Sequence, residues 1–407
     1  MKCGLLGRKL GHSYSPQIHS YLGDYSYALF EREPEEVEDF LKNGDFSAIN
    51  VTIPYKKTVM PYCRLTDTAR RMGSVNTVVR QSDGTLLGHN TDYFGFLSLV
   101  KRSGLNPAGK KCLVLGSGGA SVTAVAVLEE LGAKVVVISR SGENNYENLH
   151  LHADAAILVN TTPVGMYPNT GISPVDLEQL PNLEGVLDVV YNPARTRLLL
   201  DAEDRGMVTG NGLWMLVAQA KEASEWFQNR KLADSLIPQI HEKLKLQMEN
   251  IVLIGMPGSG KSTIGKLVAK ALGKTFVDAD QKLEETFGRR IPDIFAADGE
   301  GAFRAMETQV LSQLGKQSGL VIATGGGCVT REENYPLLHQ NGTVFCLERE
   351  LSKLPTDGRP LSQANPLEAL YRVRKPLYAR FADHSVDNNG TAEDTTREIL
   401  RMIGGKL

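Results

Sequence analysis

The sequence contains few cysteines and no long apolar segment. Five cysteines occur among 407 residues, with no C-x-x-C pair and no spacing typical of a metal site. Neither a disulfide framework nor a zinc site is therefore expected, and a reducing, cytoplasmic compartment is favoured. Because no uninterrupted apolar run reaches membrane-spanning length and the first residues include charges, we expect no membrane helix and no signal peptide.

An excess of either sign of charge is also missing. The chain has 45 basic and 47 acidic residues, and its 42% hydrophobic and 23% charged residues are typical of a soluble globular protein. A nucleic-acid partner is disfavoured because it would require a basic tail or patch. Glycine, in contrast, is frequent: its 40 residues gather in short loops after apolar runs, as in α/β proteins that bind nucleotides. Small molecules are the expected partners.

Short apolar runs that lead into Gly-rich turns predict buried strands of parallel sheets. Three such runs are Cys112–Leu115, Ile251–Ile254 and Leu320–Ala323. A helical pattern extends from Leu213 to about Lys245 and ends in the charged run from Glu242 to Asn250, which shows no periodicity.

The length predicts two or three domains at about 150 residues each. We expect residues 1–104 to form a first lobe, with 210–245 packing back on it, and residues 105–209 to form a second lobe. A linker at 246–249 then leads to a final domain at 250–407.

The strongest motif is a phosphate loop that starts at Gly255 and reads G-M-P-G-S-G-K-S-T. It follows a predicted strand and opens a helix, so its backbone N–H groups and the helix dipole can hold phosphate oxygens. Lys261 is expected to reach the β- and γ-phosphates of ATP, and Ser262 to ligate Mg²⁺. The expected ATP-binding residues here are Gly258, Ser259, Gly260, Lys261, Ser262 and Thr263.

A second apolar strand is predicted to end in the carboxylates Asp278 and Asp280. Side chains at i and i+2 of a strand leave on the same face, so one carboxylate can serve the metal and the other an acceptor hydroxyl. We expect Asp278 to be the metal-shell residue. Several arginines after these carboxylates, together with the run Gly325–Gly327, predict an anionic acceptor.

The final domain carries six motifs in this order: the phosphate loop, D-x-D, F-R-x-x-E, G-G-G, R-P-L and R-x-P-L-Y. With these motifs, residues 250–407 resemble a shikimate kinase. The resemblance implies that Arg304 and Arg374 clamp the carboxylate of shikimate. Gly326 and Asp280 would also hold shikimate, and Asp280 would be the candidate base for its 3-hydroxyl.

The resemblance further implies that Lys261 and Arg359, the latter on a lid, neutralise the transferring phosphate. In related kinases the stretch between the strand end and the R-P-L arginine is longer and carries another arginine near the adenine. Here it reads Arg349 to Gly358, shorter and with Pro355 in the middle.

A dinucleotide turn is predicted at Gly116–Ala120, between a strand and a helical run to Leu131. The next strand, Lys134–Ile138, is followed by Ser139 and Arg140, where an NAD-binding unit would carry an acidic residue. Because a guanidinium with hydroxyls suits a 2′-phosphate, the sequence favours NADP.

The first lobe presents hydroxyls, amides, a lysine and a carboxylate in four short motifs. They are Ser13-Tyr14-Ser15, Asn50 to Lys56, Val75-Asn76-Thr77 and Asn90-Thr91-Asp92. Each motif alone is typical of a turn. Together, ahead of an NADP-like unit, they resemble a shikimate dehydrogenase across residues 1 to about 245.

This second resemblance implies that Lys56 and Asp92 are the catalytic pair, with the lysine passing a proton to the alkoxide as hydride arrives. Ser13 and Ser15 would bind the substrate carboxylate. The residues implied around the ring are Thr52, Asn76, Asp92, Tyr191 and Gln219. The residues implied to hold or touch the cofactor are Asp67, Gly116, Ser117, Gly118, Gly119, Ala120, Ser139, Arg140, Val189, Gly212 and Met215.

The implied fold class is α/β: a two-lobe dehydrogenase unit, with an α/β substrate lobe and a Rossmann lobe, followed by a P-loop domain with a parallel sheet. The implied reactions are consecutive: NADPH reduces 3-dehydroshikimate, and ATP with Mg²⁺ phosphorylates the shikimate formed. Two alternatives remain open: quinate or another hydroxy acid as the substrate of each half, and a degenerate enzyme pair that serves as a ligand sensor.

Overall fold

The computed structural model describes residues 1–11, 13–354 and 367–404. These residues form two compact units. The first comprises Met1–Gly165, Ser173–Tyr191 and Asp201–Lys243, and the second comprises Met166–Ile172, Asn192–Leu200 and the chain from Leu244 onward. Within the described ranges, no helix combines the length and the apolar character that a membrane span requires.

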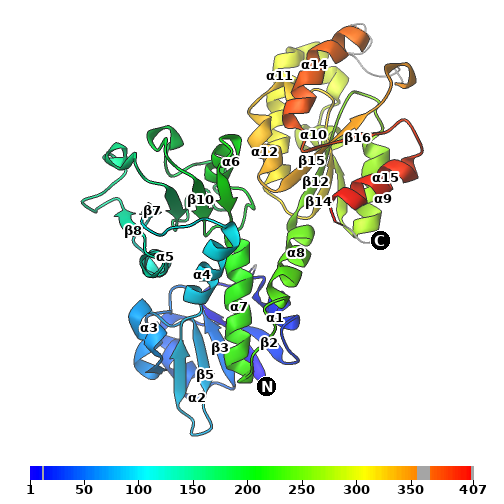
Figure 1. Ribbon diagram of the computed structural model, residues 1–407. Helices are drawn as coiled ribbons and strands as arrows, with labels where there is room; N and C mark the ends of the chain where they lie inside the picture. The colour runs from blue at the N-terminus through cyan, green and yellow to red at the C-terminus, as the bar shows by residue number, and fades with distance from the viewer. Residues whose placement is uncertain (12, 355–366, 405–407) are drawn as a thin grey trace. The chain divides into compact units, whose positions relative to one another are not determined.

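The first sheet has six strands in the order β2-β1-β3-β5-β6-β4 (Figure 1). Its strands are β1 Lys2–Gly7, β2 Ser26–Glu31, β3 Ala48–Val51, β4 Arg64–Leu65, β5 Thr77–Arg80 and β6 Leu86–His89. The helices of this region are α1 Ser15–Ser20, α2 Val37–Asn43 and α3 Asp67–Met72. The sheet is mixed because β5 pairs antiparallel with both β3 and β6. In the β3–β5 pair, Asn50 lies opposite Thr77.

The second sheet is entirely parallel, in the order β11-β10-β9-β7-β8. Its strands are β7 Lys111–Leu115, β8 Lys134–Ile138, β9 Ile157–Asn160, β10 Gly185–Asp188 and β11 Val208–Gly210. The helices around it include α4 Asp92–Ser103, α5 Gly119–Glu130 and α6 Arg197–Asp204. The predicted strands at 112–115 and 134–138 and the helix after the glycine turn are confirmed.

A close approach of two helices links the catalytic region to the second sheet. α4 packs along α7, which spans Gly212–Gln228. A Cβ added to Gly95 of α4 would lie only 2.8 Å from Met215 O and 3.0 Å from Gln219 Cβ. Because a side chain at Gly95 would push the helices apart, this glycine sets the spacing between Asp92 and Gln219.

The helical stretch predicted from Leu213 to about Lys245 is helical over most of its length but is divided into two helices. α7 ends where Asn229 adopts a left-handed conformation with φ 48°, which Asn tolerates better than most residues. The buried Glu225 then accepts hydrogen bonds from Leu232 N and Lys231 Nζ, which fix the turn. A second helix, α8, runs from Leu236 to Met248, so most of the expected linker is helical.

The third sheet, in the second unit, is parallel with the order β13-β14-β12-β15-β16. Its strands are β12 Asn250–Ile254, β13 Thr275–Asp278, β14 Leu320–Ala323, β15 Gly342–Glu348 and β16 His384–Asp387. Its helices are α9 Lys261–Leu272, α10 Ala279–Phe287, α11 Ile291–Gly315, α12 Asn334–His339, α14 Leu367–Phe381 and α15 Ala392–Met402. The predicted strands at 251–254 and 320–323 are confirmed.

Alternation along β12 explains why helices cover both faces of this sheet. Val252 and Ile254 pack with residues of α10, α11, α12 and α14, whereas Ile251 and Leu253 pack with residues of α9 and α15. Since successive strand residues point to opposite faces, an uninterrupted apolar strand requires a layer on each side. Figure 1 shows the two helical layers. Short 3₁₀ turns at 34–36, 60–62, 149–152, 177–179, 328–330 and 351–353 complete the described elements.

Candidate active sites

The predicted catalytic pair of the first unit forms an ion pair. Lys56 Nζ donates to Asp92 Oδ2 at 2.5 Å, and the two side chains are 28% and 11% exposed. Lys56 lies in the turn after β3, where its carbonyl accepts a hydrogen bond from Val75 N. Asp92 is the first residue of α4. A partly exposed lysine held by a buried carboxylate can donate a proton to a ligand on its open side.

Asn76 fixes the other oxygen of this carboxylate. Its Nδ2 donates to Asp92 Oδ1 at 2.9 Å, and its Oδ1 accepts from Thr91 N at 2.7 Å. Asn76 is therefore bonded both to the Asp92 side chain and to the backbone at the start of α4. The structure brings three predicted residues, Lys56, Asn76 and Asp92, into one hydrogen-bonded group.

The remaining predicted substrate residues come from several segments of the first unit. Ser15 N donates to Ser13 Oγ at 3.2 Å, which places the two serines in one turn before α1. The Tyr191 ring meets the ring of Tyr14 edge-on, with centroids 6.3 Å apart. On α7, Gln219 Oε1 is buried without a hydrogen-bond partner among the described residues. Such an atom is suited to bind a ligand hydroxyl, because leaving it unpaired is costly.

A cavity of about 570 Å³ lies beside the predicted dinucleotide turn. Five predicted cofactor residues line it, namely Gly116, Ser117, Gly118, Ser139 and Arg140. The lining residues that the sequence did not indicate are Tyr146, Thr161, Thr162, Pro163, Val164, Ser173 and Pro174. The turn leads into the N-terminus of α5, and Arg140 follows β8, so this cavity offers the groups that a dinucleotide with a 2′-phosphate requires.

Other predicted cofactor residues lie outside the lining of this cavity. Gly119 and Ala120 begin α5. Gly212 begins α7, and its N–H donates to the carbonyl of Val190, the residue after Val189. The buried Met215 packs in the core of the second sheet. The side chain of Asp67 is fully exposed and pairs with Arg70 at 2.7 Å.

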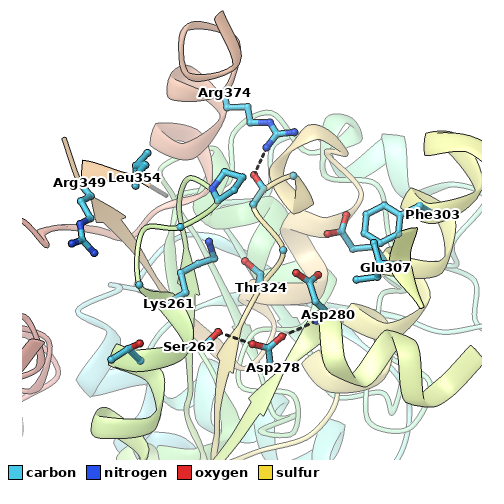
Figure 2. A pocket seen from close by; sticks show the side chains of 18 of the residues that line it. Lys261, Ser262, Asp278, Asp280, Phe303, Glu307, Thr324, Arg349, Leu354 and Arg374 are labelled. Carbon is cyan, nitrogen blue, oxygen red and sulfur yellow. Dashed lines mark hydrogen bonds between the residues drawn. The ribbon is translucent and has the colours of Figure 1, made fainter. Parts of the chain in front are cut away.

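A cavity of about 1060 Å³ lies at the carboxyl ends of the strands of the third sheet (Figure 2). It starts at the phosphate loop after β12. From β12 the sheet extends to β14 and β13 on one side and to β15 and β16 on the other, and open α/β sheets bind ligands where the strand order reverses in this way. The predicted residues that line it are Gly258, Gly260, Lys261, Ser262, Thr263, Asp278, Asp280, Arg304, Gly326 and Arg374. Ser259, in contrast, is fully buried, and its carbonyl accepts from Asn388 Nδ2.

The two aspartates reach this cavity in a different way from the one predicted. The strand β13 ends at Asp278, and α10 begins at Ala279, so the two carboxylates do not share a strand face. Asp278 Oδ1 instead caps α10 by accepting from Asp280 N and Gln281 N. An aspartate at the end of a strand can also be the N-cap of the helix that follows, and Asp278 is the N-cap of α10 here.

Ser262 and Asp278 provide oxygen atoms suited to magnesium. Ser262 Oγ donates to Asp278 Oδ2 at 2.6 Å (Figure 2). No group of three or more acidic, histidine or cysteine side chains in the described parts of the chain could hold a metal by itself. Mg²⁺ commonly takes only one or two protein oxygens and completes its shell with phosphates and water, so these two residues fit it.

Lys261 is held inside the phosphate loop. Its Nζ donates to Gly255 O at 2.9 Å and to Met256 O at 3.0 Å. These carbonyls orient the ammonium group at the centre of the loop, where the phosphates of a nucleotide would lie.

A cluster of buried charges forms the far side of the cavity. Arg304 Nη1 donates to Glu307 Oε2 at 2.8 Å, and both side chains are less than a tenth exposed. Burial, with Glu307 and Asp278 nearby, raises the pKa of Asp280 to about 6. Burial also raises the pKa of Glu307, whose Oε1 has no hydrogen-bond partner among the described residues. Perturbed carboxylates beside a phosphate loop are typical of a catalytic site.

The glycine run allows the arginines to approach the backbone. A Cβ added to Gly327 would lie 2.0 Å from Arg304 Nη2, so only glycine leaves room for this guanidinium. Gly326 O accepts from Arg374 Nη1 at 3.1 Å and also from the Tyr378 hydroxyl. The run therefore positions both arginines that the sequence predicted at the acceptor.

One predicted residue, Arg359, lies outside the described residues. Another arginine was not predicted: Arg349 lines the cavity, and its Nη1 is 3.8 Å from the position of a Cβ on Gly260. Figure 2 shows its side chain on the phosphate-loop side. Further lining residues that sequence reasoning missed include Glu284, Ile291, Phe295, Phe303, Glu307 and Thr324. Phe303 and Glu307 belong to the F-R-x-x-E motif, whose helical spacing was the available signal.

The folds and sites define the class of the chain: a two-lobe dinucleotide-type oxidoreductase joined to a P-loop phosphotransferase. Two family models match it. The shikimate dehydrogenase substrate binding domain matches residues 5–78, and shikimate kinase matches residues 257–404.

Known proteins agree with this over the first part of the chain. The NADP(+) shikimate dehydrogenase of Clostridium perfringens strain 13 is 37% identical over 265 residues, which cover 60% of this chain and 97% of the relative. Shikimate dehydrogenase 1 from Peptoclostridium difficile is 37% identical, with a TM-score of 0.55, covering 60% of this chain and 98% of that one.

A third similar structure is the shikimate 5-dehydrogenase of Thermus thermophilus in complex with NADP(H) and shikimate. It is 30% identical with a TM-score of 0.55, and the match covers 60% of this chain and 99% of that one. The chain belongs to the shikimate dehydrogenase family and carries a shikimate kinase domain in the same polypeptide. It is a bifunctional shikimate-pathway enzyme, both an oxidoreductase and a kinase.

Proposed function

We propose that the first unit reduces 3-dehydroshikimate to shikimate with NADPH, and that the second transfers the γ-phosphate of ATP to that shikimate with Mg²⁺. The observation that carries this proposal is the Lys56–Asp92 ion pair, 2.5 Å apart, in a chain that also holds a phosphate loop and paired arginines. The product of the first reaction is the acceptor of the second.

In the reductase, NADPH bound at the 116–120 turn would supply hydride to the substrate carbonyl. Lys56 would donate the proton to the developing alkoxide, and Asp92 would hold the ammonium in place. Ser13 and Ser15 would bind the carboxylate with neutral hydroxyls. The ring would lie among the side chains of Thr52, Asn76, Tyr191 and Gln219.

In the kinase, Lys261 and the phosphate-loop N–H groups would bind the phosphates, while Ser262 and Asp278 would hold Mg²⁺. Arg304 and Arg374 would clamp the acceptor carboxylate, and Asp280 would accept the proton of the attacking hydroxyl. Phosphoryl transfer depends mainly on positioning and charge stabilisation, which this group of charges supports. Arg359 would add a positive charge near the γ-phosphate.

The domain limits 1–104 with 210–245, 105–209 and 250–407 belong to the same proposal, supported by the three separate sheets. A reducing, cytoplasmic setting is supported by five free cysteines.

A coupled assay on the purified chain tests the function. 3-Dehydroshikimate and NADPH are added first, then ATP and Mg²⁺, and nicotinamide absorbance and ADP release are followed separately. We expect both signals, with ADP release dependent on the first reaction or on added shikimate. A higher kcat/KM for quinate would favour the hydroxy-acid alternative, and binding of shikimate without either reaction would favour the sensor.

A further inference from the structure

Asn50 was not among the predicted site residues, yet it sits at a junction of hydrogen bonds. Its Nδ2 donates to Asn76 O and to Thr77 Oγ1, each at 3.3 Å, and its Oδ1 accepts from the Tyr27 hydroxyl at 2.8 Å. The antiparallel register that places Asn50 opposite Thr77 creates the contact between these two side chains. One amide thus connects three strands of the first sheet, because Tyr27 lies on β2, Asn50 on β3 and Thr77 on β5.

On one side, the chain of hydrogen bonds leads to the ion pair. Thr77 Oγ1 donates to Asn76 Oδ1 at 3.1 Å, and Asn76 Nδ2 donates to Asp92 Oδ1 at 2.9 Å. Lys56 Nζ completes it at Asp92 Oδ2. Asn76 and Thr77 are buried, so water does not compete for these groups.

On the other side, the chain leads to the serine turn. Tyr27, whose hydroxyl donates to Asn50, is also a hydrogen-bonding neighbour of the Ser15 side chain. Its ring is stacked 4.1 Å from the ring of the buried His19, and the Phe227 ring of α7 lies 5.5 Å from His19 with the planes 18° apart. This stack limits the rotation of Tyr27.

A buried, neutral histidine adjoins this group of side chains. Burial lowers the pKa of His19 to about 3, so the ring is neutral and carries one N–H, and the Asn50 side chain is one of its hydrogen-bond partners. Its Nδ1 is 2.7 Å from the Tyr25 hydroxyl, which in turn is 2.7 Å from Ser224 Oγ.

We propose that Asn50 and Tyr27 are positioning residues of the reductase, which tie Ser15, at the carboxylate end of the substrate, to Asn76 and Asp92 at the reacting carbonyl. The inference rests on the function proposed above for Ser15 and Asp92. The substrate ring spans the interval between these ends, so a fixed separation places its carbonyl against Lys56. Small errors in such placement are costly to the rate.

The test measures KM and kcat of the reductase for one variant on each side of the network. Tyr27→Phe removes the hydroxyl next to Ser15, and we expect KM for 3-dehydroshikimate to rise about fivefold with kcat changed less than about twofold. Thr77→Val removes the hydroxyl next to Asn76, and we expect kcat to fall about fivefold with KM little changed. Thr77→Ser keeps the hydroxyl and should restore kcat.

Tyr62→Phe is the matched control, because the Tyr62 hydroxyl bonds only to exposed Glu38 in the described contacts. Each variant is compared with wild type by urea unfolding, and the kinase activity of the same chain measures the amount of folded second unit. Wild-type rates, proportional losses in both constants, or failure of Thr77→Ser to recover kcat would each overturn the positioning role. An inactive wild-type reductase would instead overturn the proposed function.

Discussion

The two active sites face the same carboxylated ring with different chemistry. The first surrounds one ion pair, Lys56–Asp92, with hydroxyls and amides, whereas the second gathers a lysine, several carboxylates and two arginines around one cavity. Hydride addition to a carbonyl develops charge on one oxygen, so one proton donor suffices. Phosphoryl transfer brings several negative oxygens together, and each needs an opposing charge. The number of buried charges follows the reaction and not the ligand.

The two sites also differ in how their buried polar and charged side chains are stabilised. In the first unit, neutral side chains satisfy one another, as in the Asn50–Thr77–Asn76 chain. In the second, Arg304 is paired with Glu307, and Asp280 lies in surroundings that raise its pKa. Charges that are buried must be paired or must shift their protonation.

The most severe test of the comparison removes Lys56, the proposed proton donor of the reductase. Lys56→Met should lower the reductase kcat by about 10²- to 10⁴-fold, the usual contribution of general acid catalysis. Stopped-flow or steady-state NADPH oxidation measures it. ADP release with added shikimate should remain within about twofold of wild type, since the kinase uses none of this machinery. A parallel loss of both activities would show that the two sites are not independent.

Removing an arginine from the kinase tests the opposite direction. Arg374→Gln should weaken shikimate binding by about ten- to a hundredfold, because a charged hydrogen bond to the carboxylate is lost. The measurement is KM for shikimate in the kinase reaction. The matched change on the first site, Ser13→Ala, should affect only KM for 3-dehydroshikimate. If Arg374→Gln altered the reductase KM instead, the assignment of the carboxylate to two different chemistries would be wrong.

The two activities should also differ in acid. The pKa of Asp280 is raised from 3.8 to about 6, so the carboxylate is ionised above pH 6 and protonated below it. If Asp280 is the base, as proposed, kinase kcat/KM should fall nearly tenfold per pH unit below that value. A pH profile from about 5 to about 8, with Asp280→Asn as the control lacking the group, measures this limb. An unchanged rate at about pH 5 would exclude Asp280 as the base.

The smallest expected effect concerns Arg349, which lies beside the phosphate loop. Arg349→Gln should raise KM for ATP by about two- to fivefold, as expected for one half-buried charge at the edge of the site, and leave KM for shikimate unchanged. Arg397→Gln, on α15 with its own partner Asp394, is the matched control. Equal KM values for ATP in the two variants would mean that Arg349 has no part in nucleotide binding.

Local sequence signals predicted what is local. Apolar runs before glycine turns predicted β7, β12 and β14. A strand that is buried on both faces is a continuous apolar run, so it can be recognised from its own residues alone. The prediction failed at Asp278, where a strand end and a helix cap use the same residue type, and at Asn229, where one left-handed residue ends α7. In both cases two local signals compete, and packing decides between them.

The sites show the same limit. The loop around Lys261 was predictable because its spacing alone defines the geometry. Asn50 and Arg349 acquire their contacts from strand register and from distant segments, which no short motif encodes. Residues that position others are therefore harder to find in a sequence than residues that bind a phosphate.

The five free cysteines can serve as probes of the unfolding of each unit. Burial raises the pKa of Cys3, Cys63 and Cys112 to about 11 and that of Cys328 and Cys346 to about 12. An unfolded thiol has a pKa of about 8.5, so loss of structure would increase its reactivity sharply. The first three lie in the first unit and the other two in the second. Pulsed alkylation followed by mass spectrometry would thus report the opening of each unit separately, with no label introduced into the chain.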